Sequence, residues 1–442
     1  MIVVFFLLAI LCIFASRKKG PLWIFSIVWL IPITLISLCI IDYNFFSKDE
    51  IRFISVLILY LSCFCAGLAL CKLMTPRKRC PTIPLRNDLI RCRGFAYVAC
   101  GVGIFGSFFL IADFFVYKGV GLNDMSALRD VVVGAPSVSW LARIASVLTW
   151  GGLYCLIFMV YFRDQLSRTQ LIFFVLPVVG YFFVALLSAG RQAAFQIMIF
   201  SLIAFFVKSA VFESSNQKVK KNWLFLIGLC ALMILFMGYM AVARNDELIS
   251  NSKAEVLADL FDFSVAQNFS LFFIFFGEGI YSVVIETLVY FSSPIALFSK
   301  FLNIEWSLPY YGVFNFPFVA RQLESVTGFS VVDVMAANAS LMAGEGVIGV
   351  GWTTSFSSLI LDFGYVGAGF VLFVQGFFTS LWWRRALCSG EFDAVAKAVV
   401  MLVLVVYMPL LSAISDTNIF FLFLYLLLID LLRRFRFFRS RN

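Results

Sequence analysis

Residues 171–208 read LIFFVLPVVGYFFVALLSAGRQAAFQIMIFSLIAFFVK. The stretch holds two apolar runs, 171–189 and 192–208, and only Gly190 and Arg191 stand between them. A run of about 20 apolar residues matches a bilayer core roughly 30 Å thick, and in lipid its backbone must be helical to satisfy its own polar groups. The stretch therefore predicts two membrane-spanning helices joined by a very short turn that contains Arg191.

The rest of the chain has the same character. Of its 442 residues, 62% are hydrophobic and 13% are charged, whereas a soluble domain carries about 25% charged residues. Further apolar runs lie near 2–16, 21–41, 53–71, 94–116, 140–162, 223–242, 353–382, 395–414 and 418–432. We predict an all-α polytopic membrane protein with about 11 spans, within a range of about 10 to 13.

Three regions follow from this spacing. Residues 1–242 form an N-terminal membrane bundle of about eight spans, and residues 353–442 hold the C-terminal spans and a basic tail. Between them, residues 243–352 form one large loop. Its part 264–302 is apolar but contains Glu278 and Glu286. A charge at a span centre costs about 2.5–3.5 kcal/mol, so we expect interfacial helices or a re-entrant pair here, with two full spans as the alternative.

The distribution of positive charge sets the orientation. Of the 34 lysine and arginine residues, 24 fall on one set of loops, which includes the tail 433–441. Cytoplasmic loops are enriched in these residues, so we place this set, Lys397 included, in the cytoplasm and the loop 243–352 outside. The net charge of +9 then reflects topology. It indicates no nucleic-acid partner, although the tail is suited to contact anionic membrane lipids.

The residue inventory excludes several kinds of chemistry. The chain has no histidine, which rules out histidine bases, Ser-His-Asp and Cys-His nucleophiles and histidine-ligated metals. None of the 11 cysteines lies in 243–352, and no CxxC pair is present. No phosphate-binding loop with its lysine occurs, so an internal ATPase is not expected. We predict no cofactor and no metal.

Several motifs together suggest a family. They are SAGRQ at 188–192, VYFSSPIALFSKF at 289–301 and TSFSSLILDFGYVGAGF at 354–370, the last following the long loop. In order and spacing, residues 117–385 resemble the Wzy-type O-antigen polymerases, which join oligosaccharide repeat units. These motifs are short, because this family shares architecture more than residues.

The resemblance implies a membrane-embedded glycosyltransferase with a helical bundle of the GT-C type. Such enzymes sit in the bacterial inner membrane and act on its periplasmic face. They transfer a growing chain from undecaprenyl diphosphate to the non-reducing end of a new lipid-linked unit and release undecaprenyl diphosphate. Besides this lipid-linked oligosaccharide and membrane lipids, a chain-length regulator and a flippase of the same pathway are candidate partners.

Under this resemblance, Arg191 is a candidate ligand for the lipid diphosphate. The first N–H groups of the helix that follows it are unpaired and carry the positive end of the helix dipole, which favours an anion. An arginine adds a planar fork of donors for phosphate oxygens, and Gly190 permits close approach. We expect a diphosphate site here, with a simple interfacial anchor as the alternative. Because a polymerase holds two lipid diphosphates, further candidates are Arg129, Arg244 and Arg321.

Glycosyl transfer also needs a base and a surface for sugar. Without histidine a carboxylate is the natural base, and we favour Glu345, then Asp333. Asp362 lies a turn or two inside a span, where an arginine or another polar group is its expected partner; an acid inside a membrane is still a functional candidate. Candidate sugar-binding residues are Tyr310, Tyr311 and Trp352, although tyrosine and tryptophan also gather at membrane interfaces.

Three other functions stay open, and the least specific of them is a lipid or small-molecule permease unrelated to glycans. An O-antigen ligase has a similar architecture and substrate, but ligases of this type carry a histidine in the outer loop, which this chain lacks. A flippase for lipid-linked oligosaccharides would be a transporter, for which internal repeats and short loops are expected. The single large loop disfavours it.

Overall fold

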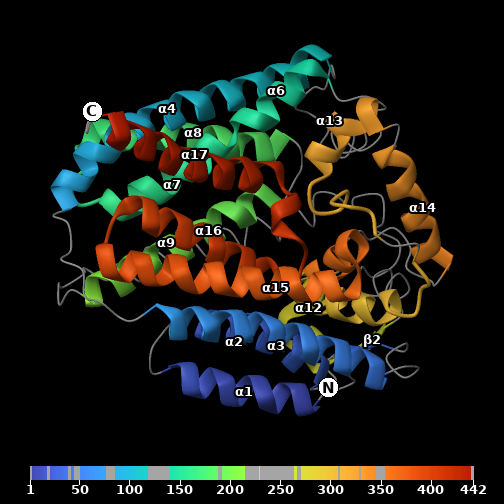
Figure 1. Cartoon of the computed structure of the whole chain (residues 1–442). Coiled ribbons are helices and arrows are strands. Elements are labelled where there is room, and N and C mark those ends of the chain that lie inside the picture. Colours follow the sequence, from blue (N-terminus) through green and yellow to red (C-terminus); the bar gives the residue numbers. More distant parts are fainter. Residues whose placement is uncertain are drawn as a thin grey trace. The chain divides into compact units, whose positions relative to one another are not determined.

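The computed structural model describes residues 2–16, 20–37, 41–43, 50–75, 85–117, 139–187, 192–214, 228, 263–265, 270–306, 309–327, 330–344 and 354–439 (Figure 1). Nearly all regular structure in these residues is helical. The two strands, β1 (Ile41–Tyr43) and β2 (Phe263–Val265), have three residues each and pair antiparallel. Apart from this short pair, the described residues confirm the expected helical fold class.

Five described helical stretches are long and apolar enough to cross a membrane. They are Glu50–Met74, Asn87–Val116, Trp140–Phe162, Gln192–Glu213 and Ser355–Ser389. Shorter apolar helical stretches accompany them at Val4–Ile13, Pro21–Ser37, Arg168–Val184, Val331–Gly344 and Thr417–Leu432. The chain therefore has the character of a helical membrane protein.

The chain divides into two compact units. Unit 1 comprises Met1–Pro76, Glu247–Leu381 and Leu404–Ser415, and unit 2 comprises Arg77–Asp246, Trp382–Val403 and Asp416–Asn442. These two units group residues that contact one another. The three regions predicted from the sequence concern placement in a membrane, which the units do not test, so those regions stay a prediction.

Unit 1 contains the helices of the N-terminus and of the middle of the chain. They are α1 (Ile2–Ser16), α2 (Pro21–Ser37), α3 (Glu50–Met74), α12 (Ser270–Phe301), α13 (Pro317–Thr327), α14 (Val331–Gly344) and α15 (Ser355–Ser389) up to Leu381. Helices α3 and α15 approach backbone to backbone, because a Cβ on Gly67 would lie 2.0 Å from Phe373 O and one on Gly376 would lie 2.2 Å from Phe64 O. Small residues permit such contacts between membrane helices.

Unit 2 contains α4 (Leu85–Ala112), a π-helical turn (Asp113–Tyr117), α6 (Trp140–Leu148), α7 (Trp150–Phe162), α8 (Arg168–Leu187), α9 (Gln192–Ser214), most of α16 (Phe392–Tyr407) and α17 (Thr417–Arg439). Helices α4, α7 and α8 pack against one another and run side by side in Figure 1. Glycine again permits the contact, since a Cβ on Gly151 would lie 2.1 Å from Ala99 O.

The described helices largely follow the predicted runs, but they differ from them in several places. The run 140–162 forms α6 and α7, which meet at Thr149; the backbone of Thr149 stays in the helical region, with φ −65° and ψ −18°. The stretch 270–301 is the single helix α12, where interfacial helices, a re-entrant pair or two spans were expected. The run 223–242, apart from Gly228, and residues 243–262 are not among those the structure describes.

Candidate functional site

Helix α15 is broken at Gly364, where φ is 69° and ψ is 175°. Glycine adopts this conformation readily because it has no Cβ. Just before the break, the carbonyl oxygens of Leu361 and Asp362 accept the backbone N–H groups of Tyr310 at 2.8 Å and of Tyr311 at 3.1 Å. The break therefore serves as a docking point for residues 309–316, which we call the docked turn.

The side chain of Asp362 fixes the same turn. It is fully buried, and its carboxylate accepts the N–H of Phe314 at 3.0 Å, the N–H of Asn315 at 2.7 Å and the Asn315 side-chain amide at 2.6 Å. Asn315 Nδ2 also donates to Ser358 O at 3.0 Å, and Asn315 Oδ1 accepts from Ser412 Oγ at 2.6 Å. Asp362 thus has the polar partner that the sequence predicted, and its two oxygens are occupied by N–H donors.

The docked turn presents one aromatic ring outward. Tyr311 is 84% exposed and has a positive φ of 52°. The ring of Tyr310 instead packs edge-to-face on Phe314, with 5.7 Å between ring centroids. Tyr310 is therefore half-buried against Phe314, whereas its neighbour Tyr311 is exposed.

Two short helices follow the docked turn in unit 1. Helix α13 begins at Pro317, directly after the turn, and carries Arg321 on its exposed face. Helix α14 packs against α13, and the side chain of Glu324 accepts the N–H of Val331 at 2.7 Å to fix the entry into α14. Asp333 lies in the first turn of α14 and is exposed.

The start of α15 adds buried hydroxyl groups. Thr354, Ser355 and Ser357 are buried, and among the residues that the structure describes their hydroxyl oxygens have no hydrogen-bond partner. Buried polar groups are nearly always satisfied by protein, water or a ligand. Together with Asp362 two turns further on, they make the first half of α15 polar inside an apolar chain.

A second polar arrangement, in unit 2, surrounds the start of α9. Gln192 is the first residue of α9 and directly follows Arg191 in the chain. Its side-chain amide donates to Asp416 Oδ2 at 2.9 Å. Asp416 Oδ1 in turn accepts the N–H groups of Asn418 at 2.9 Å and Ile419 at 3.2 Å, and so caps α17. Asp416 thereby connects the first turns of two helices.

The environment of Asp416 changes its acidity. Burial raises the pKa of its carboxyl above the ordinary range, while the hydrogen bonds that it accepts, among them those from the N–H groups of Ile419 and Asn418, act in the opposite direction. One helical turn after Gln192, the buried Gln196 accepts from the Tyr181 hydroxyl. This end of α9 is polar in an otherwise apolar bundle.

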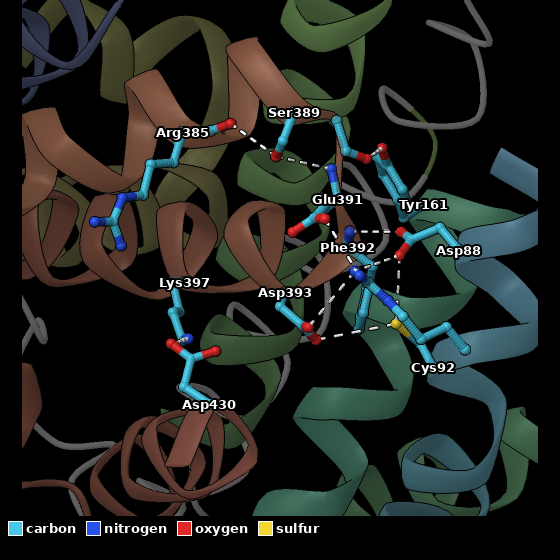
Figure 2. Close-up of polar contacts among 12 residues, drawn as sticks. Asp88, Cys92, Tyr161, Arg385, Ser389, Glu391, Phe392, Asp393, Lys397 and Asp430 are labelled. Carbon is cyan, nitrogen blue, oxygen red and sulfur yellow. Dashed lines mark hydrogen bonds and ion pairs between the residues drawn. The ribbon is translucent and has the colours of Figure 1, made fainter. Parts of the chain in front are cut away.

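A third cluster lies around the link between α15 and α16 in unit 2 (Figure 2). The carboxylate of the buried Asp88 accepts the N–H of Phe392, the first residue of α16, at 2.6 Å. Arg91 pairs with Asp88 at 2.9 Å and with Glu391 at 3.2 Å. A carboxylate beside the first N–H groups of a helix stabilises that helix end, so this cluster caps α16 from another helix.

Further contacts stabilise the same region. The Tyr161 hydroxyl donates to the carbonyl of Gly390, whose φ of 62° ends α15 in the left-handed conformation. Lys397 is fully buried and forms an ion pair with Asp430 (Figure 2). It also lies 4.5 Å from the ring centroid of Trp382. Among the described residues, no group of three or more His, Cys, Asp or Glu side chains is arranged to hold a metal ion. We interpret the cluster as a structural clamp.

The structure describes four of the predicted site residues besides Asp362, namely Tyr310, Tyr311, Arg321 and Asp333. It brings Tyr310, Tyr311 and Asp362 together. The remaining predicted residues lie in parts of the chain that the structure does not describe: Arg129, Gly190, Arg191, Arg244, Glu345 and Trp352.

Sequence reasoning did not select Asn315, Ser412 or Gly364. The first two are a common amide and a common hydroxyl, and only the fold brings them to Asp362. Gly364 did offer a signal, because a glycine inside an apolar helical run next to an acid often marks a special backbone conformation.

Comparisons of the chain with protein-family models, with curated proteins and with solved structures found no match. The described helices and the site place the protein in a general class: a helical membrane protein with one polar, broken helix.

Proposed function

We propose that the protein polymerises oligosaccharide repeat units carried on undecaprenyl diphosphate. It acts as a membrane-embedded glycosyltransferase on the periplasmic face of the bacterial inner membrane and makes O-antigen or a related surface polysaccharide. In this proposal the chain has about 11 spans in a GT-C-like bundle, with the loop 243–352 outside. A chain-length regulator and a flippase of the same pathway are its partners.

The observation that carries the proposal is the broken helix α15 with its buried Asp362. A lipid-linked sugar is apolar at one end and polar at the other, so an enzyme that handles it needs polar groups at the membrane. Interrupted helices supply such groups, because backbone that leaves the helical pattern is tolerated only where protein or a polar cavity satisfies it. In α15 the docked turn satisfies that backbone and carries the candidate sugar-binding residues Tyr310 and Tyr311.

The chemistry is the displacement of a lipid diphosphate by a sugar hydroxyl. A hydroxyl oxygen of the acceptor sugar forms a bond to the anomeric carbon of the donor, and the bond from that carbon to the diphosphate breaks. The hydroxyl proton passes to a carboxylate, Glu345 or Asp333, and undecaprenyl diphosphate departs with the electron pair. Asp362 holds the docked turn in place, since its oxygens are already engaged by three N–H donors.

Arg191 is the proposed diphosphate ligand. Support comes from its neighbour Gln192, which opens a 23-residue helix and is held by Asp416. The unpaired N–H groups at a helix start favour an anion, and arginine stabilises the charge that develops on a leaving diphosphate. Arg321 on the exposed face of α13, together with Arg129 and Arg244, supplies charge for the second lipid diphosphate.

A flippase is the second candidate, because transporters also use broken helices. The test is a gene deletion in the source organism, followed by separation of its surface glycans by size. Loss of a polymerase leaves single repeat units on the surface, loss of a flippase leaves none, and loss of a ligase leaves long chains on the lipid carrier. We expect single units only, and a full ladder when the wild-type gene is returned; either other pattern would contradict the proposal.

A further inference from the structure

Among the residues that the structure describes, Tyr311 is the one non-glycine residue with a positive φ, at 52°. This left-handed conformation is unfavourable for residues with a Cβ, and asparagine and glycine tolerate it best. A large aromatic residue at such a position is therefore held there by its surroundings at a cost in free energy.

Residues of the docked turn and of α15 hold Tyr311 in this conformation. Its N–H donates to Asp362 O, and Asn315, four residues later, is fixed by two hydrogen bonds to the Asp362 carboxylate. Val313 and Asn315 are buried and anchor the far side of the turn. The backbone of Tyr311 is thus determined from both sides.

The ring of Tyr311 gains nothing from this arrangement in the fold itself, because the residue is 84% exposed. Backbone strain that survives without a packing benefit is typical of sites that contact a ligand. A tyrosine that only anchors a protein at a membrane interface needs no unusual backbone. The strain and the exposure together indicate that the outward orientation of this ring has a functional role.

We propose that Tyr311 is a fixed stacking surface for a sugar ring of the lipid-linked substrate; this inference rests on the proposed function. The C–H groups on one face of a sugar ring carry partial positive charge, and the face of an aromatic ring is negative. A ring fixed in advance loses little conformational freedom when the sugar binds, which improves affinity. The bonded neighbours on α15, Leu361 and Asp362, are positioning residues for this surface.

The test uses replacements that separate the ring from the backbone. Tyr311→Gly and Tyr311→Asn both tolerate a positive φ and both remove the ring, whereas Tyr311→Phe keeps the ring. The glycan ladder of a deletion strain carrying each variant is measured together with membrane abundance, and the thermal unfolding midpoint of each purified variant is measured in detergent.

We expect Tyr311→Gly to unfold at or above the wild-type temperature, since strain is relieved. Its polymer yield per molecule should nevertheless fall about tenfold or more, as on losing a principal binding contact, and Tyr311→Asn should behave alike. Tyr311→Phe should retain clearly more of the wild-type polymer yield than these two variants. In the purified reaction, the Gly variant should need a higher concentration of lipid-linked units for half-maximal rate, with a smaller change in the maximal rate.

Normal ladders from Tyr311→Gly at normal abundance would overturn the inference, as would a loss that tracks abundance alone, which indicates a membrane anchor. If the wild-type gene itself restores no ladder, the proposed function fails and the stacking surface fails with it. A restored wild-type ladder with an unaffected Gly variant leaves the proposed function standing and removes only the inference.

Discussion

Asn315 and Asp362 are joined twice: the backbone N–H of Asn315 and its side-chain Nδ2 both donate to Asp362 Oδ2, at 2.7 Å and 2.6 Å. The two residues are 47 positions apart in the chain. This double contact connects the turn that carries Tyr310 and Tyr311 to the break in α15, so the geometry of the candidate sugar surface depends on one buried carboxylate.

Asp362→Ala should therefore destabilise unit 1. It leaves the buried N–H groups of Phe314 and Asn315 without their acceptor, and one such unsatisfied group costs about 1–3 kcal/mol. Thermal unfolding of the purified protein in detergent measures the loss. The control is Glu305→Gln, which changes an exposed carboxylate in the same unit. Equal stability of the two variants would show that the docked turn does not depend on Asp362.

Gly67→Ala should disrupt the contact of α3 with α15. The new Cβ would lie 2.0 Å from Phe373 O and 2.8 Å from Phe377 N, and backbone atoms cannot move aside easily. Overpacking of this kind costs about 1–3 kcal/mol. Gly94→Ala is the matched control, because a Cβ there meets nothing within 4 Å and alanine favours a helix. A lower unfolding midpoint for the first and an unchanged or higher one for the second is expected; the reverse order would contradict the packing described.

The ion pair of Lys397 with Asp430 should show strong coupling. Asp430→Leu alone removes the carboxylate that pairs with the fully buried Lys397. Breaking a fully buried pair costs about 3–5 kcal/mol, and we expect a smaller loss here because Asp430 is partly exposed. Lys397→Met with Asp430→Leu removes both charges and should recover most of that loss. Unfolding of the two single variants and the double variant completes the cycle. Additive losses in the double variant would show that the pair is not coupled.

The sequence predicts some features of the structure well and others not at all. Long apolar runs determine helices whatever their neighbours are, so α1, α3 and α8 are predictable to within about three residues. That Asp362 needs a polar partner follows from burial alone. That the partner is Asn315 does not follow, because no local pattern links residues so far apart.

Charged residues in apolar runs show the same limit. Lys397 counts from the sequence as one of the positive charges on the cytoplasmic side. In the structure it is buried in α16 and paired with Asp430. The break at Gly364 was also missed, since a single glycine in an apolar run is compatible with both a straight and a broken helix. Its conformation depends on the docked turn.

Arg191 is expected to bind the diphosphate through its planar fork. Arg191→Ala should abolish the glycan ladder at normal membrane abundance, because loss of one donor to a developing charge typically costs about 100- to 1,000-fold in rate. Arg191→Lys keeps the charge without the fork and should restore activity only partly. If Lys works as well as Arg and Ala lowers abundance alone, Arg191 is an interfacial anchor.

Polymerisation by the purified protein tests the proposed function most directly. The protein is reconstituted in liposomes with lipid-linked repeat units, without nucleotide sugar or ATP, and with or without a metal chelator. Products are separated by length, and released undecaprenyl diphosphate is quantified. We predict chains of several units, one undecaprenyl diphosphate released for each linkage formed, and no effect of the chelator, because the lipid diphosphate is already an activated leaving group whose charge arginines stabilise. Intact single units with no diphosphate release, or a strict requirement for added nucleotide, would contradict it.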